Sequence, residues 1–417
     1  MLGTLLLAQP TEPRSSSALS SRRLGRLLIE AVRSAPKRKR PLSQLLDRAS
    51  SDELVRLAEL AAHHRVAGVV YRSLCDAGFN GEPLPTLRAR YHAAAASDLC
   101  LRAELTALAG VLQDLSQPWL VLKGPTLVEL AYGGDVGLRD YGDLDLLTSR
   151  VGFGPMLEVI EQAGGRVLET NWPLLSRLRH GEITLRLPMG GLGDLHWHLI
   201  YYPSWRARFA VQMDELLDRS VTAVIGATRV RVLERTDQLL HLCLHGALSG
   251  GHLLIWLKDI EQMVASSPPD WDELLVRARR YRLGLICALM LQRARLVLGA
   301  GVPSEVIDAL APDRLLLGLW ALQQRYAGDA PWGRFERTGQ TLMAATSAGS
   351  FSSLDAFCGS LVKDVAWAGT RRRIVALRGG ARRGGANREQ VSVLFQPVGG
   401  DGERRRYVEV IATDAGP

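Results

Sequence analysis

The chain has 417 residues, of which 47% are hydrophobic, 23% are charged and 6% are aromatic, and its formal net charge is +8. A chain of this length can form two or three domains with buried cores, and its hydrophobic content excludes an intrinsically disordered protein. No apolar run approaches the roughly 18 residues of a membrane-spanning helix. Residues 1–8 are apolar but lack the preceding basic residue of a secretory signal. We therefore expect a protein without a membrane span.

The cysteines are widely separated and form no Cys-x-x-Cys pair (Cys75, Cys100, Cys243, Cys287 and Cys358). Their spacing argues against a zinc ribbon or a disulfide framework, and it favours buried free thiols in a reducing cytoplasm. The net charge of +8 admits a nucleic-acid partner, although composition alone does not decide it.

Residues 1–50 are predicted to form a basic, largely irregular N-terminal tail. A short helix is expected around residues 24–32, and the Pro-Lys-Arg-Lys-Arg run of residues 36–40 breaks it. Residues 51–115 are predicted to be a helical region, because apolar side chains recur at helical spacing.

Residues 116–235 have the pattern of a compact α/β or α+β core, in which alternating segments are separated by helical ones. The strand candidates are residues 119–122, 143–147, 166–169, 183–187 and 194–200. Residues 236–348 are predicted to be a helical domain. Residues 349–417 are predicted to be a basic Gly/Arg-rich tail, in which residues 391–395 and 407–412 can pair as a terminal hairpin.

Three aspartates carry the most informative pattern. Asp143 and Asp145 are separated by one residue in a strand candidate, so their carboxylates share one face of the strand. Asp194 lies on a different strand candidate and can add a third carboxylate. Such a set can bind two divalent cations, of which one activates an attacking oxygen and the other stabilises a leaving pyrophosphate.

Cationic groups precede the aspartates in the sequence. Lys123 and Gly124 stand where a strand candidate turns into a helix, and Arg139 approaches the Asp143 strand. A lysine, an arginine and the amides of such a turn can hold the charge of a triphosphate. This layout suits nucleotidyl transfer better than hydrolysis by a serine triad.

The segments LKGPTLVELAY, GLRDYGDLDLL and GDLHWHL resemble the uncharacterised nucleotidyltransferase family of the DNA polymerase beta-like superfamily. The resemblance covers residues 50–300 and includes the upstream His-Arg-Val of residues 64–66. It implies an α+β fold: a small mixed-sheet nucleotidyltransferase core flanked by N-terminal and C-terminal helical regions. It departs from the wider superfamily at Lys123-Gly124, where that superfamily has Gly-Ser. Thr126 is then the hydroxyl that can reach a phosphate.

When the functional residues of this family are assigned to the matching positions of this sequence, the resemblance implies that Asp143, Asp145 and Asp194 are catalytic and metal-binding residues. It also implies that Lys123, Gly124 and Arg139 lie on the nucleotide side. The expected enzyme uses Mg²⁺ or Mn²⁺ to transfer an NMP, above all AMP, from an NTP to a hydroxyl or phosphate of a small-molecule, peptide or protein acceptor. Asp194, or a hydroxide on the metal, would deprotonate the acceptor.

Two other functions stay open. One is a non-catalytic nucleotide- or partner-binding regulatory protein on the same fold. The other is an enzyme that adds nucleotides to RNA ends, which the low aromatic content disfavours, as it disfavours nucleic-acid partners in general.

Histidines and charges outside the aspartate pattern are interpreted as structural. His241 and His245 have the spacing of a zinc helix, but they lack the glutamate of His-Glu-x-x-His and an evident third ligand. His196 and His198 are expected on the face of Asp194, more as packed strand residues than as reacting groups. Lys258 and Asp259 are as consistent with a solvated helix face as with nucleotide binding.

The positive charge is concentrated at the two ends. Residues 1–50 contain ten basic and three acidic side chains, and residues 366–417 contain ten basic and five acidic ones, so the remaining body has a net charge of −4. We therefore expect a mildly acidic catalytic body with basic, mobile ends.

Overall fold

A computed structural model of the chain describes residues 14–311 and 393–413. The rest of the predicted helical domain after residue 311 and most of the predicted Gly/Arg-rich tail lie outside these residues. Among the described helices, none combines the length and the apolar composition that a bilayer span requires.

A mixed sheet of seven strands forms the centre of the fold, in the order β3-β4-β5-β2-β1-β7-β6. β2 runs parallel to β5, and β1 runs parallel to β7, whereas the other neighbours are antiparallel. The strands are β1 (Trp119–Val121), β2 (Asp143–Thr148), β3 (Arg166–Val167), β4 (Glu182–Arg186), β5 (Leu192–His196), β6 (Val221–Ile225) and β7 (Thr228–Val232). The expected α+β class is confirmed, although the β6–β7 hairpin was not among the strand candidates.

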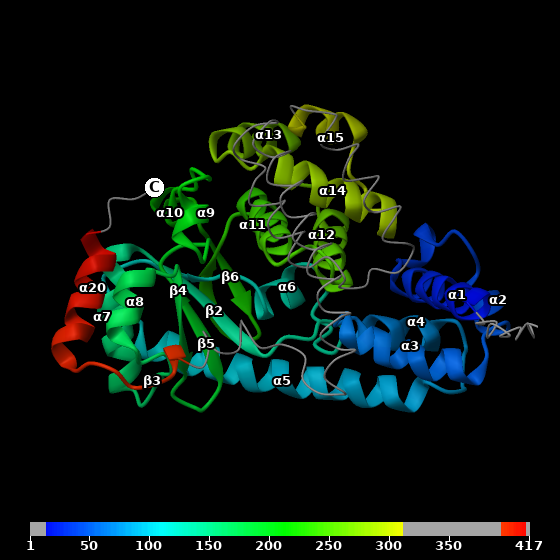
Figure 1. Cartoon of the computed structure of the whole chain (residues 1–417), viewed down its shortest axis with the longest axis horizontal. Helices are drawn as coiled ribbons and strands as arrows, with labels where there is room; N and C mark the ends of the chain where they lie inside the picture. Colours follow the sequence, from blue (N-terminus) through cyan, green and yellow to red (C-terminus); the bar gives the residue numbers. More distant parts are fainter. Residues whose placement is uncertain (1–13, 312–392, 414–417) are drawn as a thin grey trace, which may run out of the picture.

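Helices cover both faces of the sheet (Figure 1). One face packs on the long helix α5 (Leu84–Val111) together with α7 (Arg150–Gln162) and α8 (Trp172–Leu178). The opposite core is built mainly by the helices of both flanking regions. These are α3 (Ser51–His63), α4 (Ala67–Asp76), α11 (Arg235–Leu248), α12 (Leu254–Ser266), α13 (Trp271–Arg280), α14 (Gly284–Leu298) and α15 (Ser304–Leu310).

Strand β2 shows how the sequence separates these layers. Leu144 and Leu146 are fully buried in the core beneath the sheet, and the alternate residues Asp143 and Asp145 face the other way.

Short helices complete the connections: α6 (Pro125–Leu130), α9 (Pro203–Arg206) and α10 (Met213–Asp218).

The short helix expected around residues 24–32 is confirmed, but the prediction of a largely irregular N-terminal tail around it is wrong from residue 14 onward. Helix α1 (Arg14–Val32), the 3₁₀ turn η1 (Ala35–Lys37) and α2 (Leu42–Leu46) precede α3. Leu24, Leu27, Leu28 and Ala31 recur at helical spacing and are buried in the helical core. This segment contacts α3, α4 and α14, so it is part of the folded body.

The predicted terminal hairpin is also wrong. Residues 401–413 form helix α20 (Asp401–Thr413), which packs on α7 and α8. The β-branched residues of this segment favour a strand locally, but Tyr407 and Ile411 are one helical turn apart and both are fully buried. The Tyr407 ring lies against Phe153 and Trp172, so tertiary packing stabilises the helix and overrides the local preference for a strand.

The cysteine prediction is only half right. Cys243 and Cys287 are buried free thiols, whereas Cys75 and Cys100 are free but exposed. Cys358 lies outside the described residues.

Candidate active site

A cavity of about 510 Å³ lies between the sheet and helices α11 and α12, and we call it the acidic cavity. Its sheet side holds four carboxylates, one lysine and one histidine. Its other walls hold aromatic and imidazole rings. The charged lining residues are Lys123, Asp143, Asp145, Glu182, Asp194 and His196.

Strand register brings the predicted aspartates together. On the parallel neighbours β2 and β5, Asp145 is the direct partner of Asp194. Asp143 is two residues before Asp145 and therefore projects from the same face. All three side chains line the acidic cavity, as the sequence pattern requires of a common site.

Asp145 is the centre of the charge network. Its Oδ1 atom lies 2.5 Å from Lys123 Nζ and 3.1 Å from His196 Nε2, and its side chain is 2% exposed. Burial alone would raise the pKa of this carboxyl, but Lys123 and His196 hold the pKa well below its usual range. Its Oδ2 atom is buried and has no hydrogen-bond partner within the described residues. Asp145 therefore stays ionised and keeps one oxygen for a further ligand.

His196 joins Asp145 to a carboxylate that the sequence reasoning missed. Its Nδ1 atom lies 3.0 Å from Oε2 of Glu182, which is its direct neighbour in the β4–β5 pairing. Burial would lower the pKa of His196, but Glu182 and Asp145 raise the pKa to about 10. The ring is therefore an imidazolium between two carboxylates. Glu182 escaped notice because only its cross-strand pairing connects it to the site.

Asp143 and Asp194 differ from Asp145 because neither has a cation in direct contact among the described residues. Burial, with the nearby Asp145, raises the pKa of Asp143. Burial and the Glu182 carboxylate raise the pKa of Asp194 to about 7. Four carboxylates against two cations leave the cavity with excess negative charge, which a bound cation would relieve.

The turn before helix α6 needs glycine. Gly124 has a φ of +70°, and a Cβ atom there would lie 3.0 Å from Cε2 of Tyr141. The Tyr141 hydroxyl donates to Asp98 Oδ1 at 2.7 Å, which fixes the ring. Thr126 does not reach the cavity, because its side chain is buried and its hydroxyl donates to the Leu122 carbonyl.

Arg139 does not line the acidic cavity. Its guanidinium makes two hydrogen bonds of 2.9 Å to the carboxylate oxygens of Asp259, and the Tyr132 hydroxyl donates to the same carboxylate. The loop before β2 is thereby tied to helix α12. Lys258 and Asp259 are buried, so the interpretation of a solvated helix face is wrong.

The second wall of the cavity comes from α11 and the start of α12. His241, His245, His252 and Trp256 line it, although the sequence favoured a structural role for the first two. Burial, and to a lesser extent Lys123, lowers the pKa of His241 to about 3, so the ring is neutral. The spacing of the histidines showed that they share a helix face, but not that this face opposes the aspartates.

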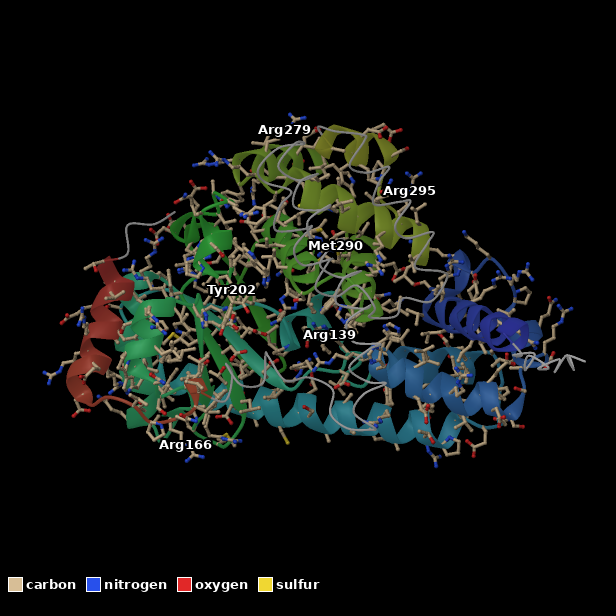
Figure 2. All side chains as sticks on the ribbon, in the orientation of Figure 1. Arg139, Arg166, Tyr202, Arg279, Met290 and Arg295 are labelled. Carbon is tan, nitrogen blue, oxygen red and sulfur yellow. The ribbon has the colours of Figure 1, made fainter. Side chains whose placement is uncertain are left out.

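Aromatic residues after β5 close the third side. Tyr201, Tyr202 and Trp205 line the cavity, and Figure 2 labels Tyr202. The side chain of Tyr202 is 42% exposed. Strand β5 ends at His196, so His198 does not continue the face of Asp194. His198 is buried, and its Nδ1 atom accepts the Ile200 amide instead.

The donor chemistry of the sheet wall fits a hard divalent cation. Carboxylate oxygens are the ligands that Mg²⁺ and Mn²⁺ prefer, and the Asp145 Oδ2 atom has no other partner among the described residues. Within residues 14–311 and 393–413, no group of three or more acidic, histidine or cysteine side chains is placed so that it could by itself hold a metal ion.

Comparison with known proteins identifies one family. The family described as uncharacterised nucleotidyltransferase matches residues 50–299, which is more than half of the chain. The chain is also similar to the solution structure of the antibiotic-resistance factor ANT(2'')-Ia, with 16% identity, 55% of this chain and 98% of that chain covered, and a TM-score of 0.27. A TM-score this low carries no information about the fold or the substrate of this chain. No curated protein matches the chain.

Proposed function

Because the chain belongs to the uncharacterised nucleotidyltransferase family, we propose that it transfers an NMP from an NTP to a hydroxyl or phosphate of an acceptor in a metal-dependent reaction. AMP is the group that we expect it to transfer. The observation that carries this proposal is the register of β2 and β5, which places Asp194 beside Asp145 and on the face of Asp143. The resulting carboxylates share one cavity with Lys123.

In this reaction the acceptor oxygen attacks the α-phosphorus of the NTP. The bond between the α-phosphorus and the oxygen that bridges to the β-phosphate breaks, and pyrophosphate leaves. Asp143, Asp145 and Asp194 would hold the divalent cation, which supplies Lewis-acid stabilisation of the phosphate charge when bound. Asp194 faces the cavity and takes the acceptor proton, and Lys123 provides a positive charge beside the phosphates.

One contact supports a second function. Lys123 Nζ lies 2.5 Å from Asp145 Oδ1, so one oxygen of a carboxylate needed for metal binding already has a partner. A protein that binds a nucleotide or a partner without turnover would keep this ion pair permanently. An enzyme would weaken it when cation and NTP enter, because Lys123 would then turn to the phosphates.

Label transfer separates the two functions. The full-length protein is incubated with each α-labelled NTP, Mg²⁺ or Mn²⁺, and host lysate, in parallel with the double variant Asp143→Asn/Asp145→Asn. Asp140 is an exposed aspartate of the neighbouring loop, so Asp140→Asn is the matched control. We expect label on an acceptor with wild type and control but not with the double variant. Retention of an NTP without any label transfer would instead support the regulatory function.

A further inference from the structure

A second cavity, of about 450 Å³, lies among the N-terminal helices, and we call it the arginine pocket. It shares no lining residue with the acidic cavity. Its lining is Arg23, Leu24, Arg26, Leu27, Arg40, Leu45, Arg48, Ala49 and Glu53. These residues lie in α1, in α2, in the connections before and after α2, and at the start of α3.

The arginine pocket carries positive charge that its own carboxylate does not neutralise. Arg40 and Arg48 are exposed, and neither makes a hydrogen bond or an ion pair within the described part of the chain. Arg23 is 52% exposed and lies 3.9 Å from Glu53. The Glu53 carboxylate also accepts the Ser50 amide in the capping box of α3. The guanidinium groups of Arg23, Arg40 and Arg48 therefore face one carboxylate that is already engaged.

The basic run of residues 36–40 is divided between this pocket and the fold. Arg38 donates to the Glu30 carbonyl, and Lys37 lies 3.9 Å from Glu261. Arg40 alone of this run lines the pocket. The positive charge there is thus a defined arrangement of side chains from α1 and from the connections before and after α2, rather than a general property of a basic segment.

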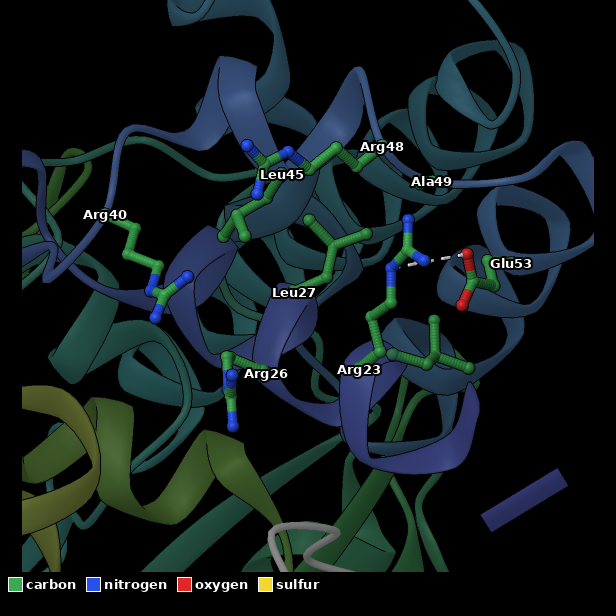
Figure 3. A pocket seen from close by; sticks show the side chains of 9 residues that line it. Arg23, Arg26, Leu27, Arg40, Leu45, Arg48, Ala49 and Glu53 are labelled. Carbon is green, nitrogen blue, oxygen red and sulfur yellow. Dashed lines mark ion pairs between the residues drawn. The ribbon is translucent and has the colours of Figure 1, made fainter. Parts of the chain in front are cut away.

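An apolar centre distinguishes the pocket from a plain anion site. Figure 3 shows the arginines around Leu27 and Leu45. Leu27 is buried, whereas Leu45 and Ala49 are only half-buried and offer apolar surface to a ligand. The aliphatic stems of the arginines add to that surface. Among the described residues no aromatic side chain lines the pocket, so they provide no stacking platform like that of single-stranded nucleic-acid sites.

We propose that the arginine pocket binds an acidic peptide segment of a partner protein, in which carboxylates flank an aliphatic side chain. Guanidinium groups match carboxylates in two-point hydrogen bonds. An aliphatic side chain packs on Leu45 and Ala49 between them, as the apolar centre of an interface packs inside a charged rim. A phosphate chain satisfies the arginines but gains nothing from the leucines. This inference does not depend on the proposed transferase activity.

Fluorescence anisotropy with the full-length protein tests the proposal. The probe is a labelled peptide Glu-Glu-Leu-Leu-Glu-Glu, compared with Glu-Glu-Ser-Ser-Glu-Glu and with a labelled hexauridylate. We expect the leucine peptide to bind at least about 10-fold more tightly than either comparison probe. The double variant Arg40→Gln/Arg48→Gln should lose about 10-fold in affinity for it. The matched control is Arg166→Gln/Arg295→Gln, which removes two exposed arginines elsewhere (Figure 2) and should leave the affinity unchanged.

A second variant tests the apolar centre. Leu45→Ala should weaken binding of the leucine peptide and leave binding of the serine peptide unchanged. Equal affinity for both peptides, tighter binding of hexauridylate, an equal loss in the control variant, or no binding of any probe would each overturn the proposal. Circular dichroism of every variant shows whether the fold is intact.

Discussion

The acidic cavity and the arginine pocket have similar volumes, about 510 and 450 Å³, but they treat charge in opposite ways. In the acidic cavity the central charges are buried and paired: Lys123 is 16% exposed and Asp145 is 2% exposed. In the arginine pocket the charges are exposed, and Arg23, at 52%, has only a distant partner. Burial makes an unpaired charge costly, whereas water tolerates it. The first arrangement suits chemistry at fixed atoms, and the second suits docking.

The largest expected effect comes from breaking the buried network. Asp145→Asn leaves Lys123 and His196 without their shared carboxylate, so we expect the free energy of unfolding to fall by about 3–5 kcal/mol. Urea unfolding without divalent cations measures it. The exposed control Asp140→Asn should stay within about 0.5 kcal/mol of wild type. A loss below about 1 kcal/mol in Asp145→Asn would contradict the network.

The next effect is a pH dependence of stability, and it comes from Glu169, a buried carboxylate with no cation beside it among the described residues. Glu169 is 5% exposed and accepts the Thr184 amide at 3.0 Å, and burial raises the pKa of Glu169 to about 7 from 4.5. Because the folded state binds the extra proton, stability falls as the pH rises through this window and then levels off. Relative to wild type, the free energy of unfolding of Glu169→Gln should therefore be about 2–3 kcal/mol higher at about pH 8 and unchanged at about pH 4.

Urea unfolding at the two pH values measures that difference, with the exposed Glu158→Gln as control. An equal effect of Glu169→Gln at both pH values would show that the carboxyl does not titrate as described.

A third comparison contrasts a buried arginine with an exposed one. Arg139→Lys removes the two-point contact with Asp259, which links the loop before β2 to α12, and should cost about 2 kcal/mol of unfolding free energy. Arg40→Lys, at the rim of the arginine pocket, should change it by less than about 0.5 kcal/mol. If Arg139→Lys and Arg40→Lys lowered the free energy of urea unfolding equally, burial would not be what makes the contacts of Arg139 more stabilising than those of Arg40.

The smallest effect concerns Gly124, the residue after Lys123, compared with Gly133 as a control. Gly133 has a positive φ of +64° and open space around it, so Gly133→Ala should lower the free energy of unfolding by about 1 kcal/mol. Gly124→Ala adds a close contact with the Tyr141 ring at a φ of +70°, so it should cost about 2 kcal/mol. The midpoints of urea unfolding compare the two variants, and equal costs would mean that the Tyr141 contact relaxes freely.

Local pattern predicted five of the seven strands, because alternation reflects burial directly, but it missed the β6–β7 hairpin. The apolar residues of DLDLL are buried and its aspartates face the cavity, as expected. The placement of Asp194 beside Asp145 needed the family resemblance, since spacing does not determine which strands pair. Glu182, His241 and His245 join the site only through cross-strand and interlayer packing, which no local pattern contains.

The ends of the chain were predicted least well, because charge concealed their helical periodicity. The leucines of α1 alternate with arginines, so the segment looked like a basic tail although its apolar side chains are buried. In α20 the β-branched residues suggested a strand, and the burial of Tyr407 and Ile411 on α7 and α8 overrides that preference. Counting charge located these segments but did not show how they fold.

Whether the acidic cavity transfers a nucleotidyl group is decided by which phosphate of the NTP reaches the acceptor. Wild type and Asp194→Asn are each incubated with Mg²⁺, host lysate and ATP labelled at either the α- or the γ-phosphate. We expect wild type to transfer the α-label to an acceptor and to release the γ-label in pyrophosphate, and we expect Asp194→Asn to transfer neither label. Appearance of the γ-label on the acceptor, or undiminished α-label transfer by Asp194→Asn, would rule out nucleotidyl transfer by this cavity.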